Sequence, residues 1–438
     1  MNEMTATATT GFTQDSFDAF LAARGEPGWL ADLRQAAWKQ FQALPLPSRR
    51  DEEWMRTDIR LFHLDKFGYL PESMAGAAVP EAVLAQNIEL AGRTVALDSH
   101  PHTAELSERW AKQGVLFGSL DRLLVEHGDR LQPYLYQALD PGADKFAALH
   151  AAFWSGGTLL FVPRGVVVDQ PLHMLSALSD GQVDLGHTLV VLEDGSEATL
   201  LAETASFHAA GTGLHLGGIE LLVGPKAFLR YVNLQNWGSG VWHFAHQKGH
   251  VDRDARLQWT IGALGSRLAK VNQHVALVGE YATAQVNGVM FTEGKQHLSY
   301  HTLQHHRAPH CKSDLLYEGA LQDTSRTVWR GMIKVDVGAQ KTDGYQRNDN
   351  LMLSEQARSD SIPGLEIEAD DVRCTHGSTT GRVDDELIFY AQARGLTRNE
   401  AIRLVVAGFF QKVFDRITID SVREALGQAI GRRIREYA

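Results

Sequence analysis

Residues 195–282 read GSEATLLAETASFHAAGTGLHLGGIELLVGPKAFLRYVNLQNWGSGVWHFAHQKGHVDRDARLQWTIGALGSRLAKVNQHVALVGEYA and contain one turn motif four times. The copies are GSEA (195–198), GPKA (224–227), DRDA (252–255) and GEYA (279–282). Their final alanines are 29, 28 and 27 residues apart. A period in the twenties is typical of a β-solenoid, in which each coil buries its inward face on the next coil. Regular turns also occur in β-sandwiches, so the spacing by itself leaves these two folds open.

The β-rich region extends from Trp154 to about Ile367. Short segments such as 188–192, 218–223 and 271–278 are apolar and are bounded by turn residues. Before this region, apolar residues at helical spacing predict a helix over 29–44, which the Leu-Pro-Leu-Pro run at 44–47 ends. The sequence also predicts short helices over 80–84 and 116–127.

The C-terminal residues are again predicted to be helical. Acidic residues open a helix over 384–394, and Gly395 follows it as a suitable C′ residue. TRNE (397–400) and SVRE (421–424) have the pattern of capping boxes that begin two further helices. We therefore predict three domains, which are a mostly helical region over 1–150, a β core over 151–376 and a helical domain over 377–438.

Composition restricts the class of protein. The 438 residues carry a net charge of −11 and an apolar fraction of 44%, as in soluble globular proteins. No cluster of Lys and Arg suits a nucleic-acid groove, so no nucleic-acid partner is expected. No apolar run approaches the roughly 20 residues that span a bilayer, and residues 1–12 lack the features of a signal peptide. Two cysteines cannot form a disulfide framework, which indicates a reducing cytoplasm.

Cys374 and His376 are the strongest candidates for metal or cofactor ligands. They lie in LEIEADDVRCTHGSTTGRVDDELIFY, residues 365–390. Thiolate and imidazole bind iron, zinc and iron–sulfur clusters, and residues i and i+2 of a strand share one face. A cluster usually has four protein ligands, so distant residues or another protein must supply the others. The pair also fits a buried free cysteine beside a hydrogen-bonded histidine.

The same segment resembles the SufB/SufD family of the SUF iron–sulfur assembly machine, and its SufD branch in particular. The matching motifs keep the order of the family. They are LPLP (44–47), EEWMRTD (52–58), His305-His306, Cys311, Ser313, KTDG (341–344), NLML (350–353), Asp370-Asp371-Val372-x-Cys374-x-His376-Gly377, Gly381-x-x-Asp384, Phe389-Tyr390 and Arg394-Gly395. Such a long collinear match is far more specific than a lone Cys-x-His.

The resemblance implies a right-handed parallel β-helix core with helices at both ends and no catalysis by this chain. It implies a complex with SufB and two copies of the ATPase SufC, which the C-terminal helices bind. A transient cluster is then expected at the SufB–SufD interface, with His376 as a ligand and Cys374 assisting or shaping the site. Reduced flavin is linked to such complexes, although no residue pattern for it is visible. Whether the isolated chain forms a homodimer stays open.

A second group of potential ligands contains five histidines and the other cysteine. They are His297, His301, His305, His306, His310 and Cys311. The first three are four residues apart, so they share a face on either a helix or a strand. The alternation of the neighbouring residues favours a strand, on which stacking alone can produce a row of histidines. A weak role in iron delivery and a purely structural role both stay open.

The acidic pairs do not indicate a catalytic site, and the standard catalytic motifs are missing from the sequence. Asp370-Asp371 and Asp384-Asp385-Glu386 suit turn formation and helix capping better than glycosidase carboxylates, which must face each other across a cleft. A change of apolar phase at Asp370-Asp371 also predicts a bend there. No GxxxxGK[ST], GxSxG or strand–helix GxGxxG is present, so ATP hydrolysis is not expected in this chain.

Two alternatives remain. A SufB-type paralogue has the same architecture, but such chains resemble His-Glu-Ala-Thr where this chain has Cys374 to Thr379, and they tend to be longer. A β-helix enzyme that acts on polysaccharide belongs to a different class and is usually secreted.

Overall fold

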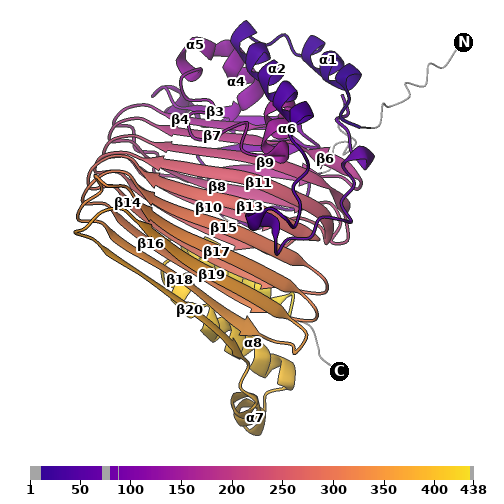
Figure 1. Ribbon diagram of the computed structural model, residues 1–438, viewed down its shortest axis with the longest axis vertical. Helices are drawn as coiled ribbons and strands as arrows, with labels where there is room; N and C mark the ends of the chain where they lie inside the picture. Colours follow the sequence, from indigo (N-terminus) through magenta and orange to yellow (C-terminus); the bar gives the residue numbers. More distant parts are fainter. Residues whose placement is uncertain (1–10, 72–78, 87, 435–438) are drawn as a thin grey trace, which may run out of the picture.

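The computed structural model describes residues 11–71, 79–86 and 88–434. The protein is a β-solenoid of about eight turns with helices near both ends of the chain (Figure 1). Strands from successive coils pair in parallel, which confirms the predicted β-helix and excludes the sandwich. Residues 1–10, on which the expectation about a signal peptide mainly depends, lie outside the described part. No helix in the described residues is long and apolar enough to cross a membrane.

Two sheets form the walls of the solenoid, and the chain alternates between them. Sheet A contains, in spatial order, β2 (His100–Leu106), β1 (Gly92–Leu97), β5 (Leu172–Leu178), β8 (Glu197–Ser206), β10 (Phe228–Asn236), β12 (Arg256–Ala263), β14 (Thr283–Thr292), β16 (Lys312–Leu321), β18 (Asp343–Met352) and β20 (Arg373–Arg382). Sheet B contains β19 (Arg358–Ile367), β17 (Arg326–Val335), β15 (His297–His306), β13 (Leu268–Leu277), β11 (Gly240–Val251), β9 (Thr212–Val223), β7 (His187–Leu192), β4 (Thr158–Val162) and β3 (Leu116–Ser119), with β6 (Gln182–Asp184) paired to β9.

The repeated motif forms the corner that leads into the strands of sheet A. At each corner one residue has a left-handed φ of 57–68°, and the next residue is buried and small. The left-handed residues are Gly195, Lys226, Asp254, Tyr281, His310 and Lys341. The small residues are Ser196, Ala227, Ala255, Ala282, Cys311 and Thr342. In the first copy this position belongs to Ser196 and not to Ala198. Glu197 pairs with Phe228, so Ser196, the residue before Glu197, corresponds to Ala227.

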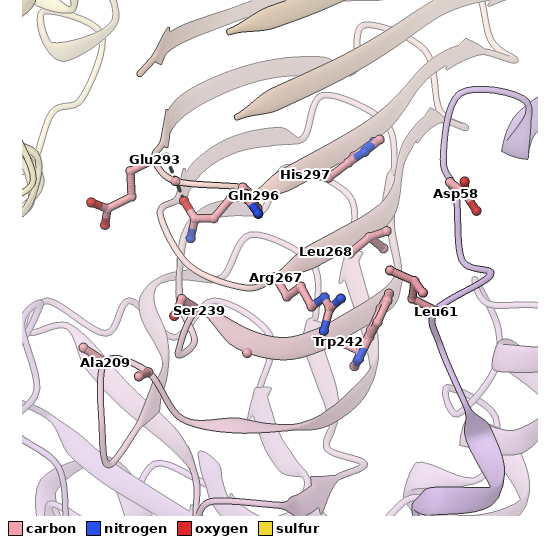
Figure 2. Close-up of a pocket in the computed structure, with 14 residues that line it drawn as sticks. Asp58, Leu61, Ala209, Ser239, Trp242, Arg267, Leu268, Glu293, Gln296 and His297 are labelled. Atoms are coloured by element: carbon pink, nitrogen blue, oxygen red, sulfur yellow. Dashed lines mark hydrogen bonds between the residues drawn. The ribbon is translucent and has the colours of Figure 1, made fainter. Parts of the chain in front are cut away.

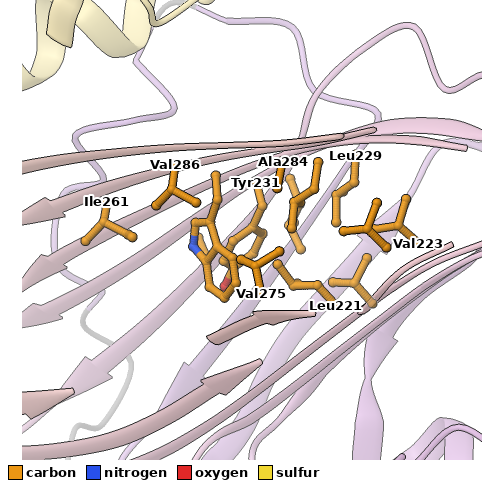
Figure 3. Packing of buried hydrophobic residues seen from close by; sticks show 14 of the residues in the cluster. Leu221, Val223, Leu229, Tyr231, Ile261, Val275, Ala284 and Val286 are labelled. Carbon is orange, nitrogen blue, oxygen red and sulfur yellow. The ribbon is translucent and has the colours of Figure 1, made fainter. Parts of the chain in front are cut away.

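Apolar side chains from the two sheets fill the space between them. Leu221, Val223 and Val275 of sheet B pack toward Leu229 and Tyr231 of sheet A, and all five are at most 2% exposed (Figure 3). Alternate residues of each strand point into this core, as expected for a β-strand with one face inside. The phase of each strand therefore decides which side chains lie inside the solenoid and which lie on its outer faces.

The N-terminal helices cover one end of the solenoid and part of the outer face of sheet B (Figure 1). They are α1 (Gln14–Ala22), α2 (Gly28–Ala43), α3 (Glu108–Ala111), α4 (Leu120–Glu126), α5 (Gly128–Leu131) and α6 (Lys145–Phe153). The helix predicted over 29–44 is confirmed by α2. Phe146 of α6 stacks on Phe244 of β11 with 4.0 Å between ring centroids. Aromatic side chains on the outer face of sheet B therefore hold the N-terminal helices against the solenoid.

A strap, residues 48–69, crosses the outer face of sheet B. It contains two short 3-10 helices, Glu52–Trp54 and Leu64–Lys66. The Thr57 hydroxyl donates to the Ser299 hydroxyl at 3.0 Å, and Phe62 packs edge-on against Trp242 at 5.3 Å. These contacts hold the strap, which contains no strand or α-helix, against the middle of the solenoid.

One predicted helix is confirmed only in part, and another is wrong. Residues 116–119 form strand β3, which pairs with β4, and only the part from Leu120 is helical. Residues 80–84 are not helical, because the carboxylate of buried Glu203 accepts the backbone N–H groups of Val83 and Leu84. A tertiary contact therefore replaces the local hydrogen bonds that a helix would make. Since β1 pairs with β5 of the core, a domain boundary near residue 150 remains a proposal.

The C-terminal helices pack on the outer face of sheet A. They are α7 (Asp385–Ala393), α8 (Arg398–Phe409), α9 (Gln411–Phe414) and α10 (Asp420–Gly431). The capping box of Thr397 and Glu400 is confirmed. The one predicted at Ser421 is wrong, because the N-cap of α10 is Ile419, two residues earlier, and it has no side-chain cap. Apolar residues such as Ile402, Val406 and Leu426 join one cluster with residues of sheet A.

Candidate functional site at the open end of the solenoid

The two ends of the solenoid differ. At the N-terminal end the sheets finish in the antiparallel strands β2 and β3, with helices nearby. At the C-terminal end the last described strands are β19 and β20, and each pairs on one side only, with β17 and β18. Their outer edges present backbone N–H and C=O groups that can pair with another strand. This end is therefore suited to joining a second polypeptide.

The structure brings Cys374 and His376 to this open end. Both lie on β20, where Cys374 is opposite Gly344 and His376 is opposite Gln346. Gln346 is fully buried, and its amide donates to the Gly364 carbonyl at 2.9 Å across the interior. Because side chains of paired parallel residues point to the same face, Cys374 and His376 face the interior. The sequence left this face undecided, and the register decides it.

Their surroundings give the two side chains different character. Cys374 is half-buried against a small apolar cluster that includes Ile333, Val335 and Ala369, whereas His376 is exposed. Burial raises the pKa of the Cys374 thiol, and the nearby carboxylate of Asp343 raises it further. The thiol is therefore protonated near neutral pH and must lose its proton to bind a metal ion. The exposed imidazole is the more accessible ligand.

Apolar residues of β19 border the same end. Leu365 and Ile367 are 37% and 40% exposed, although their register partners Ile333 and Val335 are fully buried. All four side chains point inward. Leu365 and Ile367 remain exposed because no further coil covers them. The predicted bend at Asp370-Asp371 is confirmed as the corner between β19 and β20. The alternating apolar residues before the bend lie on β19 of sheet B, and those after it lead into β20 of sheet A.

The second group of histidines does not converge. His297, His301 and His305 lie along the outer face of β15, so successive members are about 13 Å apart. His306 faces the interior and its Nε2 is 2.8 Å from the Ser313 hydroxyl, while His310 stacks on Tyr281 at a corner. The strand interpretation is confirmed. Among the described residues no group of three or more His, Cys, Asp or Glu could hold a metal ion.

Cys311, the other cysteine, has a structural position. It is fully buried at its corner, and its thiol donates to the Gly279 carbonyl at 3.2 Å. Burial raises the pKa of this thiol to about 11. It fills the same small position as Ala282 in the preceding coil.

Sequence reasoning missed two buried glutamates that position the N-terminal segments. Glu220 on β9 is fully buried and accepts backbone N–H groups of Tyr136, Ala138 and Leu139 at 2.7–3.1 Å, with His187 at 3.2 Å. Glu203 has the corresponding role for Val83 and Leu84. No sequence signal distinguishes these glutamates from solvent-exposed ones, because their partners are backbone groups far away in the chain.

The C-terminal helices expose a second apolar surface. Leu387, Phe389 and Tyr390 of α7 are 54–73% exposed, and Leu404 of α8 is 61% exposed. Figure 1 shows α7 extending beyond the end of the solenoid. These four residues, here called the α7 surface, are candidates for contact with a partner.

Family models match two adjoining parts of the chain. The SufBD core domain of SUF-system iron–sulfur cluster assembly matches residues 174–409, and the SufBD N-terminal region matches residues 18–174. The chain belongs to the SufBD family. This confirms the resemblance found in the sequence and assigns the chain to the proteins of SUF-system cluster assembly. It also removes the interpretation as a polysaccharide-acting enzyme.

Curated SufBD relatives align along most of the chain. The iron–sulfur cluster assembly protein SufD of Bacillus subtilis is 28% identical over 99% of this chain and 100% of that protein. Iron–sulfur cluster assembly SufBD family proteins of Staphylococcus epidermidis and Staphylococcus aureus are each 25% identical over 92% of this chain and 88% of the relative.

Proposed function

We propose that this chain is a SufD-type scaffold subunit whose open solenoid end joins a SufB subunit and contributes His376 to a nascent iron–sulfur cluster. The observation that carries the proposal is the position of the Cys-x-His pair. It lies on the terminal strand, faces inward, and is adjacent to unpaired backbone edges and exposed Leu365 and Ile367. The cluster is cargo, assembled and passed on.

Strand pairing at the free edges gives the interface its affinity and its register. A partner strand that pairs with β20 places its own side chains within about 5 Å of the corresponding β20 residues. A thiolate from that strand would then lie near the His376 imidazole. Cys374 contributes a second sulfur or, being half-buried with a raised pKa, shapes the wall behind the histidine. The partner completes the ligand set.

The ATPase SufC is the proposed partner of the C-terminal helices. The α7 surface supplies an exposed apolar area, while α8 and α10 are fixed to sheet A by buried residues. A force applied by SufC to α7 is therefore transmitted to the sheet that ends in β20. ATP hydrolysis belongs to SufC in this proposal, and this chain is not an enzyme. Reduced flavin at the level of the complex and a cytoplasmic location remain expectations.

The alternative of a SufB-type subunit is less well supported. The full-length alignment to a SufD and the Cys-Thr-His-Gly-Ser-Thr sequence at 374–379 both favour the SufD type. Co-expression with SufB and SufC candidates, followed by measurement of subunit ratio, distinguishes the two types. A SufB-type chain would assemble with a SufD candidate instead.

The direct test is His376→Ala in a strain that lacks the native copy. We expect loss of cluster assembly in the complex, measured by cluster absorbance, with unchanged protein level and unchanged SufB and SufC binding. Thr375→Ala is the matched control, because Thr375 is exposed and lies on the opposite face of β20. Normal cluster assembly by the His376 variant would disprove the ligand role.

A further inference from the structure

Opposite charges balance in the cavity beside the strap. This cavity of about 740 Å³ lies between Asp58 and Leu61 of the strap and the turns before β11, β13 and β15 (Figure 2). Its lining contains two carboxylates, Asp58 and Glu293, and two cations, Arg267 and Lys295. The contact between the C-terminal helices and sheet A is different, because a buried carboxyl group there lies beside a second one.

The buried carboxyl group is that of Glu318, between β16 and α9. It alternates with Tyr317, which points into the core, so its side chain points to the outer face of sheet A. The C-terminal helices cover this face, and Glu318 is 1% exposed. The backbone N–H of Val413 in α9 donates to its carboxylate. The Oε2 atom has no hydrogen-bond partner among the described residues, so a charge on Glu318 is poorly compensated.

Asp349 is the second carboxyl group. It is the register partner of Glu318 on β18, and it is 4% exposed. Paired residues of neighbouring strands are about 5 Å apart and point to the same face. The Arg347 guanidinium donates to the Asp349 carboxylate at 2.8 Å, and the Thr379 hydroxyl also donates to it. These contacts stabilise the ionised form of Asp349, whose charge then opposes a second charge on Glu318.

The cations near Glu318 do not offset these effects. Lys412 of α9 and Arg347 both favour its ionised form, but neither makes an ion pair with it in the part of the chain that the structure describes. Lys412 is exposed, and Arg347 is bound by Asp349. The register partner of Glu318 on β14 is the apolar Val289. Burial, and then the charge of Asp349, raises the pKa of Glu318 to about 7.

We propose that Glu318 is a proton-dependent latch, which holds α9 and α10 on sheet A more strongly when its carboxyl group is protonated. When these helices lift from the sheet, water reaches Glu318, and a solvent-exposed glutamate is ionised near neutral pH. The docked state therefore binds more protons than the undocked state. Docking becomes stronger as the pH falls and weaker as the pH rises. The latch depends on this chain alone and not on the proposed cluster site.

Amide hydrogen exchange of the full-length chain at pH 6 and pH 8 tests this proposal. With a pKa of about 7 when docked and about 4.3 when exposed, Glu318 should make docking about tenfold more favourable at pH 6 than at pH 8. After correction for the intrinsic effect of pH on exchange, amides of α9 and α10 should be better protected at pH 6 by the same factor. Amides of β11, on the opposite wall, are the internal reference.

Three variants separate the latch from a general effect of pH. Glu318→Gln should remove the difference in protection, because its amide does not titrate. Glu424→Gln is the matched control and should keep the difference, because Glu424 is exposed on α10. Asp349→Asn removes the opposing charge, so the change in protection should move to lower pH. This variant keeps the test valid if Glu318→Gln does not fold.

Equal protection of α9 and α10 at the two pH values in the unmodified chain would overturn the proposal. So would a Glu318→Gln variant that keeps the pH difference of Glu424→Gln, or an Asp349→Asn variant whose change in protection stays at the original pH. Thermal unfolding of each variant at both pH values distinguishes a loosening of the helices from a loss of the whole fold.

Discussion

Replacing Glu220 with alanine should destabilise the protein more than most single substitutions. The Glu220 carboxylate is fully buried and accepts three backbone N–H groups from residues 136–139, at 2.7, 2.7 and 3.1 Å. Each buried donor left without an acceptor costs about 1–3 kcal/mol. The turn at 136–139 can relax and admit water, so the three costs do not add in full. We expect a loss of about 3–5 kcal/mol in the free energy of unfolding.

Glu280→Ala is the matched control for this measurement. Glu280 is exposed at a corner, so its removal should change stability by no more than about 0.5 kcal/mol. Urea unfolding followed by tryptophan fluorescence gives the two stabilities, and amide hydrogen exchange shows whether residues 136–139 lose protection. A Glu220 variant as stable as the Glu280 variant, with unchanged exchange, would show that the carboxylate does not hold this segment.

Three other predictions concern separate parts of the molecule. Burial lowers the pKa of Lys270 to about 7. The unfolded chain then binds more protons than the folded chain between pH 7 and 10, so stability should rise over this range by up to about 4 kcal/mol. Urea midpoints of Lys270→Met should lack that rise, and an unchanged slope would contradict the assignment. Leu365→Ser with Ile367→Ser should reduce SufB capture in a pull-down while thermal unfolding changes little; undiminished capture would move the interface elsewhere. Phe389→Ser, at a side chain 73% exposed, should reduce SufC capture but not SufB capture, and equal loss of both would indicate misfolding.

The corners show how far the sequence predicts the fold. The small buried residue is visible in the sequence at the three corners where it is alanine, Ala227, Ala255 and Ala282. Ser196 was missed because a search for alanine selects Ala198, two residues later. Left-handed φ angles at Lys226 and Tyr281 have no local signal, since such side chains rarely adopt this conformation. Stacked backbone hydrogen bonds impose it, for example from the Lys226 N–H to the Arg253 carbonyl at 2.8 Å.

The candidate site was predicted in part. Residue types and spacing identified Cys374 and His376 and placed them on one face of a strand. The sequence did not tell which face this is, because the apolar pattern before the bend and the pattern after it belong to different walls. Leu365 and Ile367 look like core residues in the sequence. They are exposed because no further coil covers them, and this depends on where the solenoid ends.

The sequence by itself determined the terminal helices and the Cys-x-His pair, because capping and ligand chemistry are local properties of the chain. The turn period left a solenoid and a sandwich open, and the family resemblance favoured the solenoid. Tertiary structure decided the register of the coils, the inward direction of the ligand pair and the burial of Glu203 and Glu220. These features depend on pairing between residues about 30 to 120 positions apart. Such pairing is set by the summed hydrogen bonds and packing of whole strands, which no local segment contains.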